Sequence, residues 1–326
     1  MQKIFPFLGG SVATSCLNLL IVAEGFVAAQ EREFHGLCLD FIDFLLKTAP
    51  FNQTQKNAGW LNIWSSFSPS SQSGAFNGAS APAGRTVFDA TSQAGELGLD
   101  QTAFEAWVSA EEFKEQDVTR PLTDIFSAGE SLSGSSGTIV VVLLPSQGGA
   151  GLEAELTPAD DQYKWLAVSA DGLWEQFLLR AIAKKVGLGD EFENEGVDFL
   201  EPADDATKWQ ISNHFNLIYS DAPPAALDTP SMPWFPLFSA IQRTDPPAVH
   251  PRTGDPATTD DSIDAFPATQ TKPEFWEGGG GFRRKVYRSA KDCLLRRKVG
   301  DPALPIRERV VPLCPACRHT VDNLIG

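Results

Sequence analysis

The stretch LWEQFLLRAIAKKVGLGDEFENE, from Leu173 to Glu195, decides how this chain is interpreted. Its first part places apolar residues three and four positions apart, which predicts an amphipathic helix with one buried face over residues 173–187. Gly187 suits the turn after this helix, because glycine adopts a left-handed backbone at little cost. An acidic run follows the turn and includes Asp190 and Glu191.

A helix, a glycine stop and a nearby carboxylate also form the frame of a zinc-peptidase helix. That helix carries HExxH, in which two histidines bind zinc and the glutamate is the general base. Counted back from Gly187, the histidine positions are Arg180 and Lys184. The glutamate position is Ala181. Arginine offers zinc no lone pair, and lysine offers one only after losing a proton. The helix and its glycine stop are therefore present without the two histidines and the glutamate. The alternative interpretation is an ordinary amphipathic helix with a basic polar face.

Composition excludes several classes of protein. The chain has 326 residues with 42% apolar content, which is enough for a sizeable core in one or two domains. A net charge of −16 excludes nucleic acid as an expected partner, because phosphate binding needs basic surface. No apolar run is long enough to predict a membrane span. The residues before Glu24 are interpreted as a buried strand, with a signal peptide as the alternative, and the compartment stays open.

The order of predicted elements is that of an α/β protein. Residues 138–144, TIVVVLL, are the strongest strand candidate and predict a central, buried position. The glycine-rich residues 146–151 follow it, without the lysine of a phosphate-binding loop. The other expected strands are 16–23, 60–67 and 163–169. The expected helices are 28–48, 103–115, 121–128 and 318–325, and a short element is expected at 207–219.

The sequence also predicts three parts along the chain. Residues 1–221 form the core with the organising helix, and residues 273–326 form a C-terminal subdomain that completes the fold. Between them, residues 222–272 are rich in Pro, Asp, Thr and Ala and show almost no periodicity. Such a composition predicts an insertion or extended loop, the least ordered part of the chain.

Several short segments, taken in order, resemble one known family. The first three are LNLLIVAEGF at 17–26, NIW at 62–64 with SGA at 73–75, and the strand and glycine loop at 140–151. The next is GLGDEFE at 187–193. The most specific are in the tail: WEGGG at 276–280, VYR at 286–288, DC at 292–293, LR at 295–296 and CPAC at 314–317. Together they are similar to the IgA-specific zinc metallo-endopeptidases, the IgA-peptidase-like zincins.

The resemblance implies a zincin-like α/β fold, with a mixed twisted sheet and a C-terminal subdomain that contains cysteines. It also exposes departures, because HExxH is missing and the family's tyrosine pair is replaced by Gly281 and Phe282. The implied function is a catalytically inactive homologue, a pseudo-peptidase that acts as a binding or structural subunit, with a protein or peptide partner or within a larger assembly. A working metallopeptidase with unusual ligands, such as Asp190, Glu191 and His214, is the main alternative. A different hydrolase chemistry lacks a visible set of catalytic groups.

Two local expectations complete the sequence analysis. The cysteines near the C-terminus, with one histidine, could form a structural zinc site made of Cys293, Cys314, Cys317 and His319, while a disulfide or buried free thiols are the alternatives. No metal is expected at the helix. There, a salt bridge from Arg180 or Lys184 to Asp190 or Glu191 would take the place of the metal.

Overall fold

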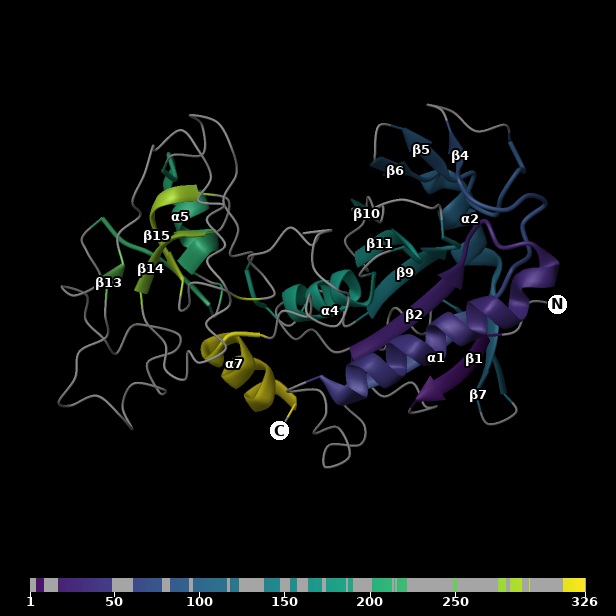
Figure 1. Ribbon diagram of the computed structural model, residues 1–326, viewed down its shortest axis with the longest axis horizontal. Helices are drawn as coiled ribbons and strands as arrows, with labels where there is room; N and C mark the ends of the chain where they lie inside the picture. Colours follow the sequence, from purple (N-terminus) through teal and green to yellow (C-terminus); the bar gives the residue numbers. More distant parts are fainter. Residues whose placement is uncertain are drawn as a thin grey trace. The chain divides into compact units, whose positions relative to one another are not determined.

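The structure is a computed structural model, in which the chain forms two compact units (Figure 1). One unit comprises Met1–Lys185 with Gly300–Arg309, and the other Val186–Val299 with Val310–Gly326. The predicted boundary at residues 221 and 222 therefore falls inside the second unit. The structure describes residues 4–8, 17–48, 61–77, 83–93, 96–115, 118–122, 138–146, 153–156, 164–171, 174–185, 187–189, 201–212, 214, 216–221, 249–250, 275–279, 282–288, 293 and 313–325.

A six-stranded mixed sheet organises the first unit and confirms the α/β class. Its four inner strands run parallel to one another, and both edge strands pair antiparallel. In spatial order the strands are β1 (Ile4–Leu8), β3 (Leu61–Ser66), β2 (Leu17–Ala23), β9 (Thr138–Leu144), β11 (Lys164–Ser169) and β10 (Glu153–Leu156). Strand β9 lies between β2 and β11, as the sequence predicts, and every one of its residues is buried.

The register of the inner strands is fixed by apolar and polar pairs alike. Leu20 of β2 lies opposite Trp64 of β3 on one side and Val140 of β9 on the other, and all three are buried. Asn18 and Asn62 face each other across β2 and β3, and the Asn62 amide donates to the Asn18 side-chain oxygen at 3.0 Å. A one-residue slip would break this buried bond and turn the apolar residues to the opposite face.

Helices cover both faces of this sheet. The short turn η1 (Ala28–Gln30) leads into α1 (Glu31–Lys47), which buries Phe34, Cys38, Phe41 and Leu45 at helical spacing. Helix α4 (Trp174–Lys185) contacts β9, β11 and α1, and the Trp174 ring lies 5.8 Å from that of Phe41. The other face is covered by α2 (Gln101–Ala110), whose Phe104 and Trp107 join a core with alternate residues of β2 and β9.

One sequence expectation in this unit is wrong at its C-terminal end. The helix expected over 103–115 ends at Ala110, and β7 (Glu112–Glu115) pairs antiparallel with β8 (Val118–Pro121). Of the helix expected over 121–128, the first residue belongs to β8. The Leu122 amide donates to the Glu111 carbonyl at 2.8 Å and closes the pair. Strand pairing overrides a modest helix propensity because it satisfies the backbone of both segments at once. Residues 123–128 lie outside the described residues.

The first unit also holds a small three-stranded sheet of β4 (Phe76–Asn77), β5 (Thr91–Gln93) and β6 (Glu96–Gly98). Asp100 caps α2 by accepting the Ala103 amide at 3.0 Å. Within the described part of the whole chain, no helix combines the length and the apolar character needed to cross a membrane.

The second unit is built on a four-stranded sheet. The strands are ordered β12 (Leu217–Tyr219), β15 (Phe282–Arg288), β14 (Phe275–Gly279) and β13 (Val249–His250). Helix α5 (Asp205–Ser212) contributes Ile211 to a small core, and α7 (Pro315–Ile325) begins three residues before the helix expected from the sequence. Of the predicted insertion at 222–272, only β13 is described, and the rest lies outside the described residues.

Candidate functional site

Helix α4 lies within residues 173–187, for which the sequence predicts the amphipathic helix. It follows β11 after a short connection and ends at Lys185, and Gly187 has a φ of +94°, which confirms the predicted left-handed turn. Its packing side is formed by Leu178, Leu179, Ile182 and Ala183, all at most 1% exposed. The helix is therefore held by its apolar face, as the three-and-four spacing predicts.

Arg180 and Lys184, where the resemblance expects histidines, differ in burial. Arg180 is only 8% exposed, whereas Lys184 is half-buried. A buried arginine does not fit the alternative of a wholly solvated basic face, because arginine is almost never buried without a partner. The side chain of Ala181 and all of Asp190 and Glu191 lie outside the described residues. The predicted salt bridge across the glycine turn thus stays a prediction.

The backbone just after the turn is clamped by a side chain that the sequence analysis missed. The amide of Gly189 donates to the Asn216 side-chain oxygen at 2.7 Å, and the Asn216 amide donates back to the Gly189 carbonyl at 2.8 Å. Both groups are buried, so the asparagine replaces a strand partner for one residue. A polar residue next to a short apolar strand, as Asn216 is next to Leu217, is the only local signal of this role.

His214 lies against the same glycine. A Cβ atom at Gly189 would fall 2.7 Å from the His214 ring, so only glycine leaves room for the histidine. Asp190, the next residue in the chain, lies outside the described residues. His214 and the clamp of Asn216 both belong to the second unit.

Phe282, where the resemblance expects a tyrosine, has a packing role. It is the first residue of β15 and is half-buried. It packs against the core formed by Ile211, Leu217 and Val286. A phenyl ring offers no proton or hydrogen bond to a substrate oxygen.

The segments AEGF and SGA, which carry part of the resemblance, meet in space. Gly25 and Gly74 both have positive φ, at 67° and 75°, and the Gly74 amide donates to the Gly25 carbonyl at 2.8 Å. A Cβ on Gly25 would lie 3.0–3.1 Å from the backbone of Gly74. The Gly25 amide donates to the Ser70 hydroxyl at 3.0 Å. These glycines are therefore explained by close backbone contact after β2 and β3.

Glu24 of the same segment is a fully buried carboxyl group. Its two oxygens accept the amides of Phe88 and Ala90 at 2.9 and 3.0 Å. Burial raises the pKa of Glu24 above its ordinary value of 4.5, while these bonds and one from Thr86 act to lower the pKa. The carboxyl group holds the loop 86–90 at the carboxyl end of β2, which is a structural task.

A second polar pair lies at the ends of the neighbouring strands. The Ser146 hydroxyl, just after β9, donates to the carboxylate of Asp171, just after β11. Asp171 is buried. Since β9 and β11 are parallel neighbours, their carboxyl ends meet at one edge of the sheet. The sequence analysis missed this pair, and a polar residue directly after a buried strand was its only signal.

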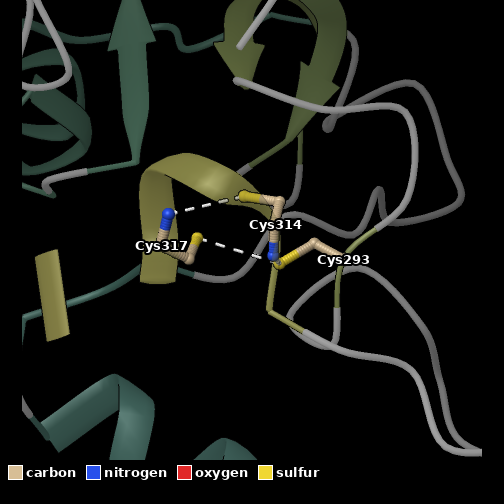
Figure 2. Close-up of side chains that lie close together, drawn as sticks. All are labelled: Cys293, Cys314 and Cys317. Atoms are coloured by element: carbon tan, nitrogen blue, oxygen red, sulfur yellow. Dashed lines mark hydrogen bonds between the residues drawn. The ribbon is translucent and has the colours of Figure 1, made fainter. Parts of the chain in front are cut away.

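Three of the four residues predicted for a zinc site come together. The sulfur atoms of Cys293, Cys314 and Cys317 all lie within 4.8 Å of one another and are buried (Figure 2). The Cys293 and Cys317 sulfurs are 3.8 Å apart, and no disulfide joins the three. His319 is not a member of this group. It stands two residues after Cys317 on α7, and side chains two apart on a helix do not share a face.

Two of these cysteines frame the start of α7. The Cys314 carbonyl accepts the Arg318 amide at 2.8 Å, so Cys314 is the N-cap residue and Pro315 takes the first helical position. The Cys317 amide donates to the Cys314 sulfur at 3.5 Å. The Cys314 amide in turn donates to the Cys293 sulfur at 3.4 Å. Backbone donors and the positive end of the helix therefore face the sulfur atoms.

The arrangement can hold a metal ion. Among the described residues, Cys293, Cys314 and Cys317 are the group of metal-ligating side chains close enough to do so. Burial raises the pKa of the Cys317 thiol far above its ordinary value, so without a cation this sulfur stays protonated at neutral pH. In comparisons with known proteins, no protein family and no curated protein matches this chain.

Proposed function

We propose that this protein is a catalytically inactive homologue of the IgA-peptidase-like zinc metallopeptidases, and that it serves as a binding or structural subunit. The observation that carries the proposal is α4. It follows β11, ends at Lys185 and is followed by the left-handed Gly187. A buried arginine stands at the position where the resemblance expects the first histidine. The order of β2, α1, β3, β9, β11 and α4 along the chain supports the resemblance from which the proposal starts.

The chemistry of the substituted positions argues against peptidase activity. Zinc activates water only while lone-pair donors hold it, and Arg180 has none at any accessible pH. Ala181 cannot take a proton from water, and Phe282 cannot hydrogen-bond an oxyanion. Removing one group of a cooperative site already lowers rates by several powers of ten. Here the ligands, the base and the phenol are replaced together.

A scaffold of this kind would act by holding a partner. The proposed partner is an extended peptide or protein segment that adds a strand to the antiparallel edge strand β10, the neighbour of β11. Main-chain hydrogen bonds would supply the affinity and need no catalytic metal. A structural zinc at the C-terminal cysteines belongs to the same proposal, because it stabilises a subunit without performing chemistry.

The first test is cleavage. Purified protein should leave casein and immunoglobulin intact, with or without added zinc. Cleavage that a chelator abolishes would overturn the proposal, provided that the activity is also lost in His214→Ala. This substitution separates activity of the chain from a contaminating peptidase.

The second test restores the missing groups. The triple change Arg180→His, Ala181→Glu and Lys184→His should add about one bound zinc per chain if α4 is a metal-helix frame. The matched control is Arg180→His with Lys184→Ala, which supplies a single imidazole and should add none. Equal zinc in the two variants would show that α4 lacks the geometry that the resemblance implies.

The second candidate is a metallopeptidase with unusual ligands, and the contact of His214 with Gly189 favours it. His214 is one of the three ligands that this candidate requires, and Asp190, another of them, follows Gly189 in the sequence. It predicts chelator-sensitive cleavage that His214→Ala abolishes. Absence of cleavage by the unmodified protein removes this candidate.

A further inference from the structure

The three-cysteine cluster is assembled from two segments that are far apart in sequence. Cys293 follows β15, whereas Cys314 and Cys317 belong to the start of α7, and 21 residues separate the first two. All three side chains are at most 4% exposed. Figure 2 shows their sulfur atoms turned toward one another.

The spacing of the sulfur atoms fits a shared ion. Zinc binds thiolates at about 2.3 Å, so two sulfurs of a tetrahedral site are about 3.8 Å apart. The Cys293 and Cys317 sulfurs show this separation, at 3.8 Å. A disulfide would require about 2.05 Å. The third sulfur, of Cys314, lies within 4.8 Å of both. Small side-chain rotations would bring all three sulfurs to the same distance from one central ion.

The surroundings of the sulfurs suit thiolates that ligate a cation. The sulfurs of Cys293 and Cys314 each accept a backbone amide, and the N-terminus of α7 brings partial positive charge to the site. Thiols are weak acceptors, whereas anionic sulfur draws strength from such donors. A bound dication also reverses the effect of burial, because a coordinating thiol is deprotonated outright.

We propose that Cys293, Cys314 and Cys317 bind a zinc ion as thiolates, and that this ion fastens the N-terminus of α7 to the segment that follows β15. This proposal rests on the part of the proposed function that includes a structural zinc. It does not depend on whether α4 is a degenerate metal helix. Soft sulfur ligands select zinc over magnesium or calcium, which prefer oxygen. The described residues supply three of the four positions that a structural zinc site fills.

Such an ion gives α7 a tether that its own length does not provide. An eleven-residue helix is marginal in isolation, and a metal that crosslinks its first turn to a distant segment lowers the freedom of both. Metal removal should therefore loosen α7 while the six-stranded sheet of the first unit stays intact.

Zinc content tests the ligands. The full-length protein should carry about one zinc per chain, and Cys293→Ser, Cys314→Ser and Cys317→Ser should each lose most of it. The matched control is Cys38→Ala, a buried cysteine of α1 in the other unit, which should keep its zinc. Zinc retained in the triple serine variant would overturn the proposal.

A measurement on the unmodified sequence covers the case in which the variants do not fold. The protein is stripped of metal under reducing conditions and titrated with Co²⁺. Expected are the visible bands of a tetrahedral ion and the sulfur-to-cobalt charge-transfer band, both lost on adding zinc. A titration without the charge-transfer band would overturn the proposal. So would a disulfide between any two of the three cysteines in protein purified without reductant.

Hydrogen exchange distinguishes a tether from a passive site. Amides of 313–325 should exchange about tenfold faster or more in the stripped protein, with protection restored by zinc. Amides of β9 should not change. Equal exchange of α7 with and without metal would show that the ion does not fasten the helix. None of these readouts depends on peptidase activity, so this proposal and the one on α4 fail separately.

Discussion

Replacing Glu24 by leucine should destabilise the first unit by removing a buried acceptor at the end of β2. The two carboxyl oxygens accept the amides of Phe88 and Ala90 at 2.9 and 3.0 Å. Leucine is similar in size but accepts nothing. The Ala90 amide keeps a second acceptor, the Thr86 hydroxyl, at 3.0 Å. The Phe88 amide therefore suffers most.

The magnitude follows from these bonds. A hydrogen bond to a charged group contributes about 1.5–3 kcal/mol, and a buried donor left unsatisfied costs about 1–3 kcal/mol. With one bond lost and one partly replaced, the free energy of unfolding should fall by about 2–4 kcal/mol. The matched control is Glu105→Leu on the exposed side of α2, where the change should stay within about 0.5 kcal/mol.

The pH dependence has a definite sign. Because burial raises the pKa of Glu24 above 4.5, the folded protein binds this proton more tightly than the unfolded chain does. That contribution to stability is fully present below pH 4.5 and is lost as the pH rises through the raised pKa. The stability of the wild type relative to Glu24→Gln should therefore decrease as the pH rises.

Urea unfolding, followed by the fluorescence of the buried tryptophans, measures the stability of each variant. Hydrogen exchange of the Phe88 amide reports the lost bond directly. If Glu24→Leu matches the control in both measurements, the carboxyl group does not hold the loop. If the advantage of the wild type over Glu24→Gln grows with pH, the amide bonds outweigh burial and the assigned cause is refuted.

Two further predictions concern glycines and the residues that surround them. Gly25→Ala should lower the free energy of unfolding by about 1–3 kcal/mol or more, because its φ is +67° and the new Cβ meets backbone at 3.0 Å. The matched change Gly36→Ala within α1, where no atom lies within 4 Å of a new Cβ, should raise it by up to about 1 kcal/mol in the same urea assay. Asn216→Ala should cost about 2–4 kcal/mol and speed exchange of the Gly189 amide, since both buried backbone groups lose their partner. Unchanged exchange of this amide would contradict the clamp.

The sequence alone determined those features that depend on local periodicity. The run TIVVVLL specifies a strand buried on both faces, and β9 lies inside the parallel part of the sheet. The three-and-four spacing of Trp174, Leu178 and Ile182 specifies the buried face of α4. The end of that helix was also predictable from local sequence, because glycine is the residue that accepts the left-handed turn at position 187.

Local sequence patterns gave the wrong prediction where a segment can form either a helix or a strand. The residues 112–115 have a modest preference for helix, but pairing with 118–121 decides in favour of strand. No periodicity pointed to the edge strand β1 or to β13, whose pairing partners are more than 20 residues away in sequence. A short strand gains its stability from its neighbour, so its own sequence carries little signal.

The candidate sites depended on tertiary structure for another reason. The sequence predicted a possible zinc site of Cys293, Cys314, Cys317 and His319, but only the folded chain shows that the three sulfurs lie together and that His319 is not a member of the group. In the same way, only the fold shows that Glu24 holds a loop more than 60 residues away. Backbone dihedral preferences and side-chain periodicity act over a few residues, whereas buried polar groups find their partners wherever the chain returns. The sequence therefore determined the long periodic elements, and the tertiary structure decided where the short strands pair and which polar side chains meet.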